Sequence, residues 1–127
     1  ENQPNDGKVG ELQKLQLDII AYTSFNNLDG RKIKELLLEN RHLWRAVIIH
    51  GNEFLLLREL ENDIWMADTI YILARDGSES QLEELVNENF EADEVHWVRD
   101  EMALVLFRNT ENYLEQNPPP VLSVWWD

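Results

Sequence analysis

Hydrophobic residues recur at helical spacing in the first third of the chain. Leu12, Leu15, Ile19 and Tyr22 follow one another at steps of three and four residues, which places them on one stripe of a helix. This helix is expected to end near residues 26 and 27, where two Asn residues stand. The pattern predicts that packing begins at Leu12.

A second helix is marked more clearly at its start. Asp29 can cap its N-terminus, and Leu28 lies five positions before Ile33, the spacing of a hydrophobic staple. The buried stripe of this helix is then expected to consist of Ile33, Leu36, Leu37 and Leu43, and the helix to end at about Trp44.

The hydrophobic period changes after the second helix. Two β-type runs, RAVIIH and EFLLLREL, are separated by Gly51 and Asn52, and Gly at the first loop position suits a type II′ turn. The pattern therefore predicts a β-hairpin over 45–60. TIYILA at 69–74 is rich in β-branched and aromatic residues and predicts a third strand that ends at a turn.

A third helix follows this strand. Ser78 with Gln81 three positions later has the form of a capping box. The face of the helix that packs inward is expected to carry Leu82, Leu85, Val86 and Phe90.

The remaining sequence predicts further strands. EVHWV at 94–98 and MALVLFR at 102–108 are joined by a polar turn and predict a second hairpin. Prolines at 118–120 predict an extended linker, and VLSVWW at 121–126 predicts an edge strand.

These elements together predict an α+β fold. Two N-terminal helices come first, and a largely antiparallel sheet follows in the order hairpin, strand, helix, hairpin, edge strand, with helices covering one face. With 127 residues, one domain is expected. We expect residues 1–10 to be a flexible leader and residues 11–127 to form a single acidic domain.

Negative charge is concentrated in the second half of the chain. The formal net charge is -14, with 11 Lys and Arg against 25 Asp and Glu. Residues 1–60 carry a balance of -1, and residues 61–127 carry -13. On the third helix, Glu79 with Glu83 and Glu84 with Glu88 are like charges four residues apart, which weakens a helix by a few tenths of a kcal/mol per pair.

This charge suggests two interpretations. The plain one is a solvated surface that only keeps the protein soluble, as in an accessory subunit. The functional one is an acidic face that attracts a basic protein, such as a nuclease or another nucleic-acid-binding protein. The residues expected to supply that attraction are Glu79, Glu83, Glu84, Glu88, Glu91, Asp93 and Glu94.

Composition excludes several other classes. No Cys is present, so disulfides, thiolate metal sites and Cys nucleophiles are absent. Direct nucleic-acid binding needs clustered Lys and Arg, and the only candidate cluster lies on the expected second helix. It consists of Arg31, Lys32, Lys34, Arg41 and Arg45, and the net charge of the whole chain argues against such binding. No run approaches the roughly 20 apolar residues of a membrane span, so we expect no membrane contact and a cytoplasmic location.

The sequence shows no catalytic motif. Its glycines stand singly, so no phosphate-binding loop is formed, and no Ser lies in a GxSxG context. His42, His50 and His96 fall in different predicted elements without metal-ligand spacing. We expect no enzyme, no metal and no cofactor; the alternative is a small enzyme with a site on the sheet face, where His50, His96 and Asp68 would be tested first.

Tryptophan is frequent, with five residues. Trp44, Trp65 and Trp97 lie in apolar runs and are expected in or beside the core. Trp125 and Trp126 are adjacent, so in an extended segment they point to opposite faces. Trp126 is the candidate anchor at the rim of an interface, because exposed Trp rings dominate binding hot spots.

The sequence thus favours a non-catalytic acidic module that binds a basic protein and regulates or inhibits it, in the manner of an immunity protein, an antitoxin or a nucleic-acid mimic. The last strand, at 121–126, is also a candidate route to homo-oligomerisation, because an edge strand offers unpaired backbone groups.

Overall fold

The computed structural model describes residues 8–51, 57–63, 65–98 and 120–127. Within them the chain forms both helices and antiparallel strands, which confirms the α+β class. The helices are α1 (Glu11–Tyr22), α2 (Gly30–Glu39), the short 3₁₀ helix η1 (Arg41–Leu43), α3 (Leu57–Glu61) and α4 (Glu79–Asn89). The strands are β1 (Ser24–Phe25), β2 (Leu28–Asp29), β3 (Trp44–Gly51), β4 (Ala67–Ala74), β5 (Glu94–Val98) and β6 (Val121–Trp125).

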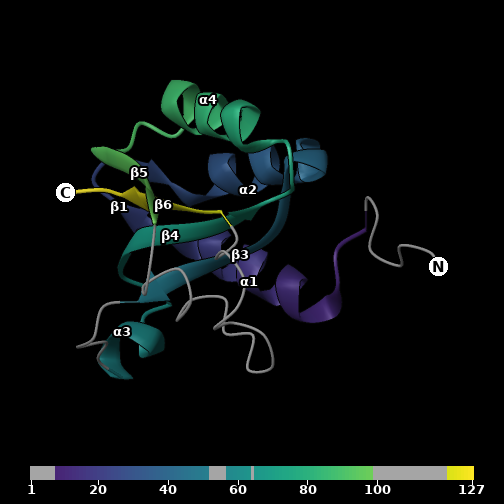
Figure 1. Ribbon diagram of the computed structural model, residues 1–127. Coiled ribbons are helices and arrows are strands. Elements are labelled where there is room, and N and C mark those ends of the chain that lie inside the picture. The colour runs from purple at the N-terminus through teal and green to yellow at the C-terminus, as the bar shows by residue number, and fades with distance from the viewer. Residues whose placement is uncertain (1–7, 52–56, 64, 99–119) are drawn as a thin grey trace, which may run out of the picture.

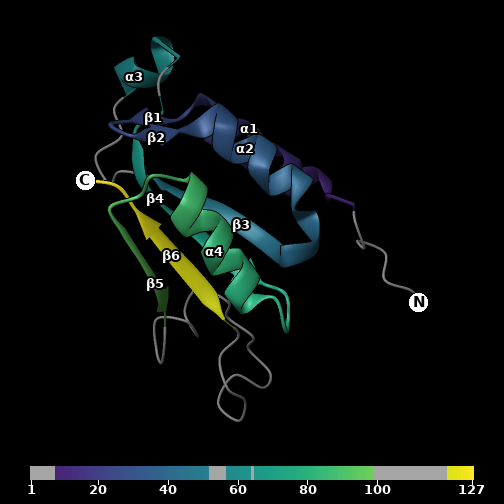
Figure 2. The same cartoon turned by 90° about the horizontal axis from the view of Figure 1, so that it is seen from above.

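The described strands form one larger antiparallel sheet and one small hairpin. The sheet has the order β3, β4, β6, β5, and the hairpin pairs β1 with β2. Ile48, Tyr71, Ser123 and His96 stand opposite one another in successive strands, so one row of side chains crosses the whole sheet. Figure 2 shows β6 lying between β4 and β5.

The core joins one face of this sheet to the helices. Alternate residues of the two inner strands, Ile70 and Leu122 among them, are fully buried there. They belong to the same cluster as Leu37 of α2 and Val86 of α4. The other face of the sheet holds a smaller cluster in which Tyr71 and Leu73 pack against Val98 and Val121.

The outer edge of β3 is covered by side-chain amides of α1. Gln13 donates from Nε2 to the carbonyl of Val47 at 2.8 Å and accepts from the Val47 N–H at 3.0 Å. Gln16 accepts from the N–H of Ile49 at 3.1 Å. An uncovered edge strand presents unpaired backbone groups, so the two glutamines take the place of a neighbouring strand.

The start of α2 packs against the end of α1 at Gly30. A Cβ atom at Gly30 would lie 1.8 Å from the carbonyl oxygen of Ile20 and 2.6 Å from that of Thr23, so only glycine fits this joint. The carboxylate of Asp29 accepts from the N–H of Lys32 at 3.3 Å, which confirms the expected cap. Figure 1 shows α1 and α2 side by side as a result.

Packing begins before the predicted position. Val9 packs against the core, and the carbonyl of Lys8 accepts from Nε of Arg41 at 3.2 Å. The expected leader over 1–10 therefore includes residues that belong to the folded part, and residues 1–7 lie outside the described ones.

The predicted buried stripe of α1 is wrong. Leu12, Leu15 and Tyr22 are 80%, 55% and 60% exposed, and Ile19 is only partly buried. The face turned inward carries Leu17 and Ile20 together with the two glutamines. Hydrophobic spacing alone could not reveal this, because the edge of β3 needs hydrogen-bond partners that aliphatic side chains lack.

Two strand predictions are also wrong. Residues 57–61, the end of the expected hairpin over 45–60, form helix α3, and β3 pairs with β4 instead. The last strand, expected at a sheet edge, is an interior strand because β4 and β5 occupy its two sides. Consequently it offers no edge to a second copy, and the proposed oligomerisation route through it is closed.

Three further expectations have different outcomes. The inward face of α4 is confirmed, with Leu82, Val86 and Phe90 buried and Leu85 partly buried. Ser78 precedes α4 but makes no side-chain cap hydrogen bond, so the capping box is not formed. The second strand of the predicted second hairpin, at 102–108, lies outside the described residues.

Candidate functional site

The predicted acidic residues are placed along α4 and the start of β5. On the helix, Glu84 and Glu88 are exposed, whereas Glu79 and Glu83 are half-buried. Glu91, Asp93 and Glu94 follow the helix and are all exposed. Glu91 has a φ of 55°, in the left-handed region, and this turns the chain from α4 toward β5.

The pairing of β5 with β6 adds one more carboxylate to this group. Glu94 stands opposite Trp125, and the N–H of Asp93 donates to the carbonyl of Trp125 at 2.9 Å. The exposed residue Asp127 follows, and its N–H donates to Oδ2 of Asp93 at 2.8 Å. We call the resulting group the acidic face: Glu79, Glu83, Glu84, Glu88, Glu91, Asp93, Glu94 and Asp127.

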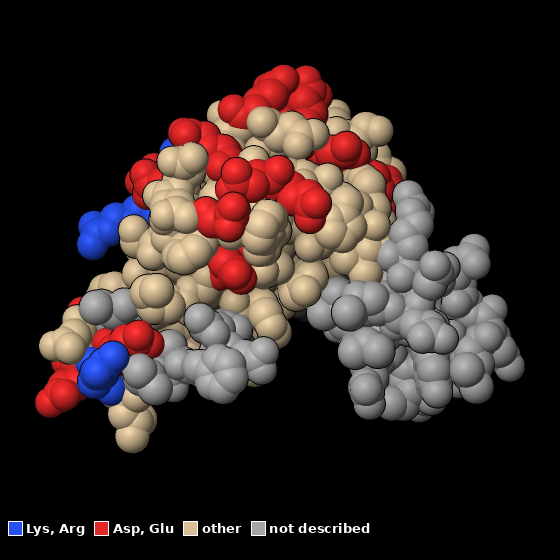
Figure 3. Space-filling view, turned by 90° about the vertical axis from the view of Figure 1, so that its left-hand side faces the viewer, with Lys and Arg blue, Asp and Glu red and all other residues tan. Residues whose placement is uncertain are grey.

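The charge on this side of the molecule is uneven. In Figure 3, Asp and Glu side chains gather over its upper part, and Lys and Arg side chains stand only at the margins of the described surface. Among the described residues one ion pair reaches the acidic face: Nζ of Lys32 lies 3.8 Å from Oε2 of Glu91, with both side chains largely exposed. An exposed pair of this kind is worth little, so the face stays strongly negative.

One acidic side chain has a structural role. Glu83 accepts from the indole N–H of Trp97 at 2.8 Å, which ties α4 to β5. This contact fixes the helix on which Glu84 and Glu88 stand. The acidic face is therefore attached to the sheet by α4 packing and by this hydrogen bond.

The prediction that Trp126 anchors the rim of an interface is wrong. Its side chain is 0% exposed, and its indole N–H donates to the carbonyl of Phe90 at 3.1 Å. It packs between the sheet and the end of α4 because β6 is an interior strand, so it cannot reach a partner. Its neighbour Trp125 is half-buried, and Trp44, Trp65 and Trp97 lie in or against the core as expected.

The two histidines of the enzyme alternative are not brought together. His50 and His96 stand on β3 and β5, with two strands between them, which separates them by roughly 14 Å at the usual strand spacing. His50 is exposed and meets the ring of Tyr71 edge-on at 6.1 Å. Asp68 accepts from the hydroxyl of Thr69 at 2.8 Å. Within the described residues no three His, Asp or Glu side chains are grouped to hold a metal ion.

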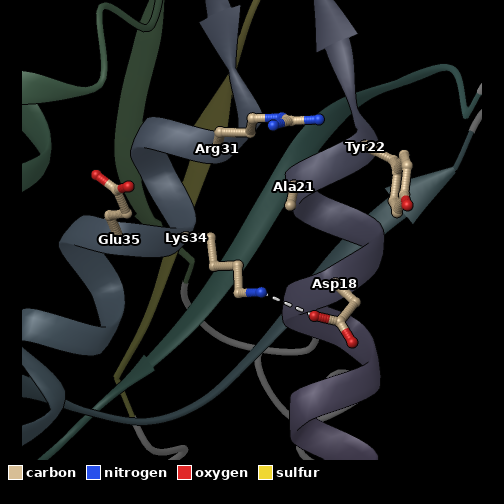
Figure 4. A pocket seen from close by; sticks show the side chains of 6 residues that line it. All are labelled: Asp18, Ala21, Tyr22, Arg31, Lys34 and Glu35. Carbon is tan, nitrogen blue, oxygen red and sulfur yellow. Dashed lines mark hydrogen bonds and ion pairs between the residues drawn. The ribbon is translucent and has the colours of Figure 1, made fainter.

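A groove between α1 and α2 was not foreseen. It has a volume of about 510 Å³ and is lined by Asp18, Ala21, Tyr22, Arg31, Lys34 and Glu35. Figure 4 shows Lys34 directed at Asp18, to which Nζ donates at 2.8 Å, while Arg31 extends above Ala21 toward Tyr22. The lining contains cations, carboxylates and a phenol, and none of His50, His96 or Asp68.

The place of Asp127 and the groove between α1 and α2 could hardly be predicted from the sequence. Asp127 joins the acidic face only because β6 pairs with β5, a long-range contact that no local pattern reports. The groove depends on Gly30 letting α2 approach the end of α1. A lone glycine directly after a helix-capping Asp was the only available hint.

Comparison with protein-family models, with curated proteins and with solved structures gave no match. None of the helices in the described ranges has the length and apolar character needed to cross a bilayer.

Proposed function

We propose that this protein is a non-catalytic module that binds a basic protein through the acidic face and regulates or inhibits it in the cytoplasm. The observation that carries the proposal is the gathering of exposed carboxylates from α4, the start of β5 and the end of β6 on one side of the molecule. Seven of the eight residues of the acidic face come from the segment 79–94, and the pairing of β5 with β6 brings Asp127 beside them.

Long-range attraction is the first part of the proposed mechanism. Carboxylates on one side raise the local potential and speed the encounter with a basic surface. Exposed charges act over about 8 Å at physiological ionic strength, so salt should slow association. Arg or Lys side chains of the partner would meet Glu84, Glu88 and Glu94, which are exposed and have no ion pair among the described residues.

Short-range contacts are the second part. With Trp126 buried, two half-buried indoles remain near the carboxylates. Trp97 lies on the α4 side of the sheet and donates to Glu83, and Trp125 lies on the other side, opposite Glu94. Aromatic residues are enriched in protein interfaces, so each of them is a candidate short-range contact. Cationic groups of the partner would also be attracted to these rings.

The two alternative functions, an accessory subunit and a small enzyme, make different predictions. An accessory subunit whose acidity only confers solubility would bind its partner equally well after the acidic face is neutralised. A small enzyme would need His50, His96 or Asp68 to serve one reaction, and the separation of the two histidines across the sheet gives no support to a site that uses both.

The experiment is recovery of partners from the native lysate at low and at high salt, followed by mass spectrometry. The bait is compared with a face variant, Glu84→Gln, Glu88→Gln and Glu94→Gln, all at exposed positions whose side chains make no ion pair with a described residue. We expect a basic protein that is retained at low salt, released at high salt and lost from the face variant.

The matched control is a second triple variant, Glu35→Gln, Glu39→Gln and Glu61→Gln, also at exposed positions but outside the acidic face. It removes the same number of charges as the face variant. A difference between the two variants therefore reports where the charge lies and not how much charge the chain carries. Equal loss of the partner from both variants would show that only net charge matters and would contradict the proposal.

A further inference from the structure

A second hollow adjoins the groove between α1 and α2. It has a volume of about 480 Å³ and is lined by the end of α1, the β1–β2 hairpin and the first residues of α2. Ala21, Tyr22 and Arg31 line both the groove and this hollow, so the two meet at these residues. Each has a volume in the range of small-molecule sites. We call the groove and the hollow together the α1–α2 depression.

Arg31 is the cation at the junction of the depression, and no neighbour neutralises it. Its side chain is exposed, and its guanidinium forms no ion pair or hydrogen bond with a described residue. In Figure 4 it extends over Ala21 toward Tyr22, whereas Glu35, one turn along α2, extends the opposite way. The guanidinium fork is therefore free to bind an anion from outside.

The other charges that line the depression have partners within the protein. Asp18 accepts from Nζ of Lys34 at 2.8 Å, and Asp29 accepts from the N–H of Lys32 at 3.3 Å. The ammonium of Lys34 keeps two further donors. Residues 8–50 carry seven Lys and Arg against five Asp and Glu, so this part of the chain does not share the acidity of the rest. The free fork with an ammonium nearby favours a carboxylate or a phosphate.

Tyr22 adds a flat apolar surface beside this cation. Its side chain is 60% exposed, and Ala21 next to it lines the same depression. An exposed guanidinium alone holds an anion weakly, because water and salt compete for it. A ligand that also lays a ring against Tyr22 gains apolar contact and stacking. The arrangement therefore favours an anion attached to an aromatic ring over a bare inorganic ion.

We propose that the α1–α2 depression binds a small aromatic molecule that carries a carboxylate or a phosphate. The anionic group lies on the guanidinium of Arg31, with Lys34 as a second donor, and the ring lies against Tyr22. Because these side chains face solvent on one side, we expect a dissociation constant of about 1 mM.

This site is separate from the acidic face. Lys32 reaches Glu91 of that face, whereas Arg31 and Lys34, three residues apart and so on one side of α2, line the groove with α1. In Figures 1 and 2, α2 lies between α1 and α4. The inference therefore goes beyond the proposed function and does not depend on it.

The test is a titration of the isotopically labelled full chain with phenyl phosphate and with benzoate at constant ionic strength, followed by NMR. We expect shift changes within residues 18–35, and the tighter of the two probes identifies the anionic group. Arg31→Gln should weaken binding at least about fivefold, because a charge-assisted contact is lost. Tyr22→Ala should weaken it about threefold or more, because the ring contact is lost. Both positions are exposed, so the variants should fold.

The controls separate this binding from general attraction. Lys14→Gln removes an exposed cation of α1 that lies outside the depression and should leave the affinity unchanged. The face variant with Glu84, Glu88 and Glu94 replaced by Gln should still bind the probe. Inorganic phosphate, which lacks the ring, and benzylammonium, which has the opposite charge, should both bind more weakly than phenyl phosphate.

Three results would overturn the inference. The first is an equal loss of affinity in Arg31→Gln and Lys14→Gln, which would show that only net charge attracts the probe. The second is binding of inorganic phosphate or benzylammonium as tight as that of the aromatic anions. The third is the absence of shift changes in residues 18–35 with either aromatic anion at about 10 mM, tenfold above the expected dissociation constant.

Discussion

The side-chain amide of Gln13 pairs with the backbone of Val47 through two hydrogen bonds, as a strand would. Nε2 donates to the carbonyl at 2.8 Å and Oε1 accepts from the N–H at 3.0 Å. This pair lies at the outer edge of β3, where the sheet would otherwise end in unpaired groups. Helix α1 therefore covers this edge with polar side chains, and its apolar residues Leu12, Leu15 and Tyr22 stay exposed.

Replacing Gln13 with Leu should destabilise the protein. The substitution keeps a side chain of similar size but leaves the part-buried N–H and carbonyl of Val47 without partners. We expect the free energy of unfolding to fall by about 2 kcal/mol, measured by urea denaturation. Gln81→Leu, at an exposed position of α4, is the control and should change it by less than about 0.5 kcal/mol. Equal effects of the two substitutions would show that the Gln13 bonds do not matter.

Replacing Gly30 with Ala should disrupt the contact between α1 and α2. The added Cβ would collide with backbone oxygens of Ile20 and Thr23, which cannot move without shifting α1. We expect a loss above about 3 kcal/mol, or loss of the folded state, in thermal and urea unfolding. Gly10→Ala meets nothing within 4 Å and serves as the control. A Gly30→Ala protein as stable as the wild type would refute the described joint.

Trp126 and Trp125 should respond differently to the same change. Trp126→Phe removes the indole N–H that donates to Phe90 and leaves a buried carbonyl without its partner, at a cost of about 1–3 kcal/mol. Trp125 is half-buried, so Trp125→Phe should cost less. Urea denaturation of both variants measures the difference. A larger effect at Trp125 would contradict the burial described here.

Local patterns predicted the elements whose neighbours are close in sequence. The Asp29 cap is formed, and the inward face of α4 was correct at Leu82, Val86 and Phe90. The third strand at 69–74 appears within β4. In each case one side of the element packs on the core, so the period of hydrophobic residues reports its orientation directly.

Long-range contacts explain the failures. The orientation of α1 depends on the edge of β3, more than 30 residues away, and the apolar row at Leu12 and Leu15 gave the opposite answer. Likewise, the place of β6 depends on pairing with both β4 and β5, which a sequence ending in two Trp residues does not reveal. The burial of Trp126 follows from that place.

The candidate site was partly predicted. Glu79 to Glu94 were recognisable because the charge changes sharply along the chain. Asp127 was missed because only strand pairing brings it beside Asp93. The groove at Arg31 and Lys34 was missed as well, since it forms between two helices whose packing no local pattern reports.

Neutralising the acidic face should not weaken the fold. Glu84 and Glu88 are exposed like charges four residues apart, so the face variant should be as stable as the wild type or more stable by a few tenths of a kcal/mol. Thermal unfolding at low salt checks this. A clear loss of stability would mean that these carboxylates hold the structure together, contrary to a role in binding.

The most direct test of the acidic face is the association rate with the recovered basic partner, measured by stopped flow across a range of salt concentrations. The account predicts a wild-type rate that falls at least about tenfold from low to high salt. The face variant should be slower at low salt and less sensitive to salt, while the Glu35, Glu39 and Glu61 variant stays close to the wild type. A rate that does not depend on salt, or that changes equally in both variants, would contradict it.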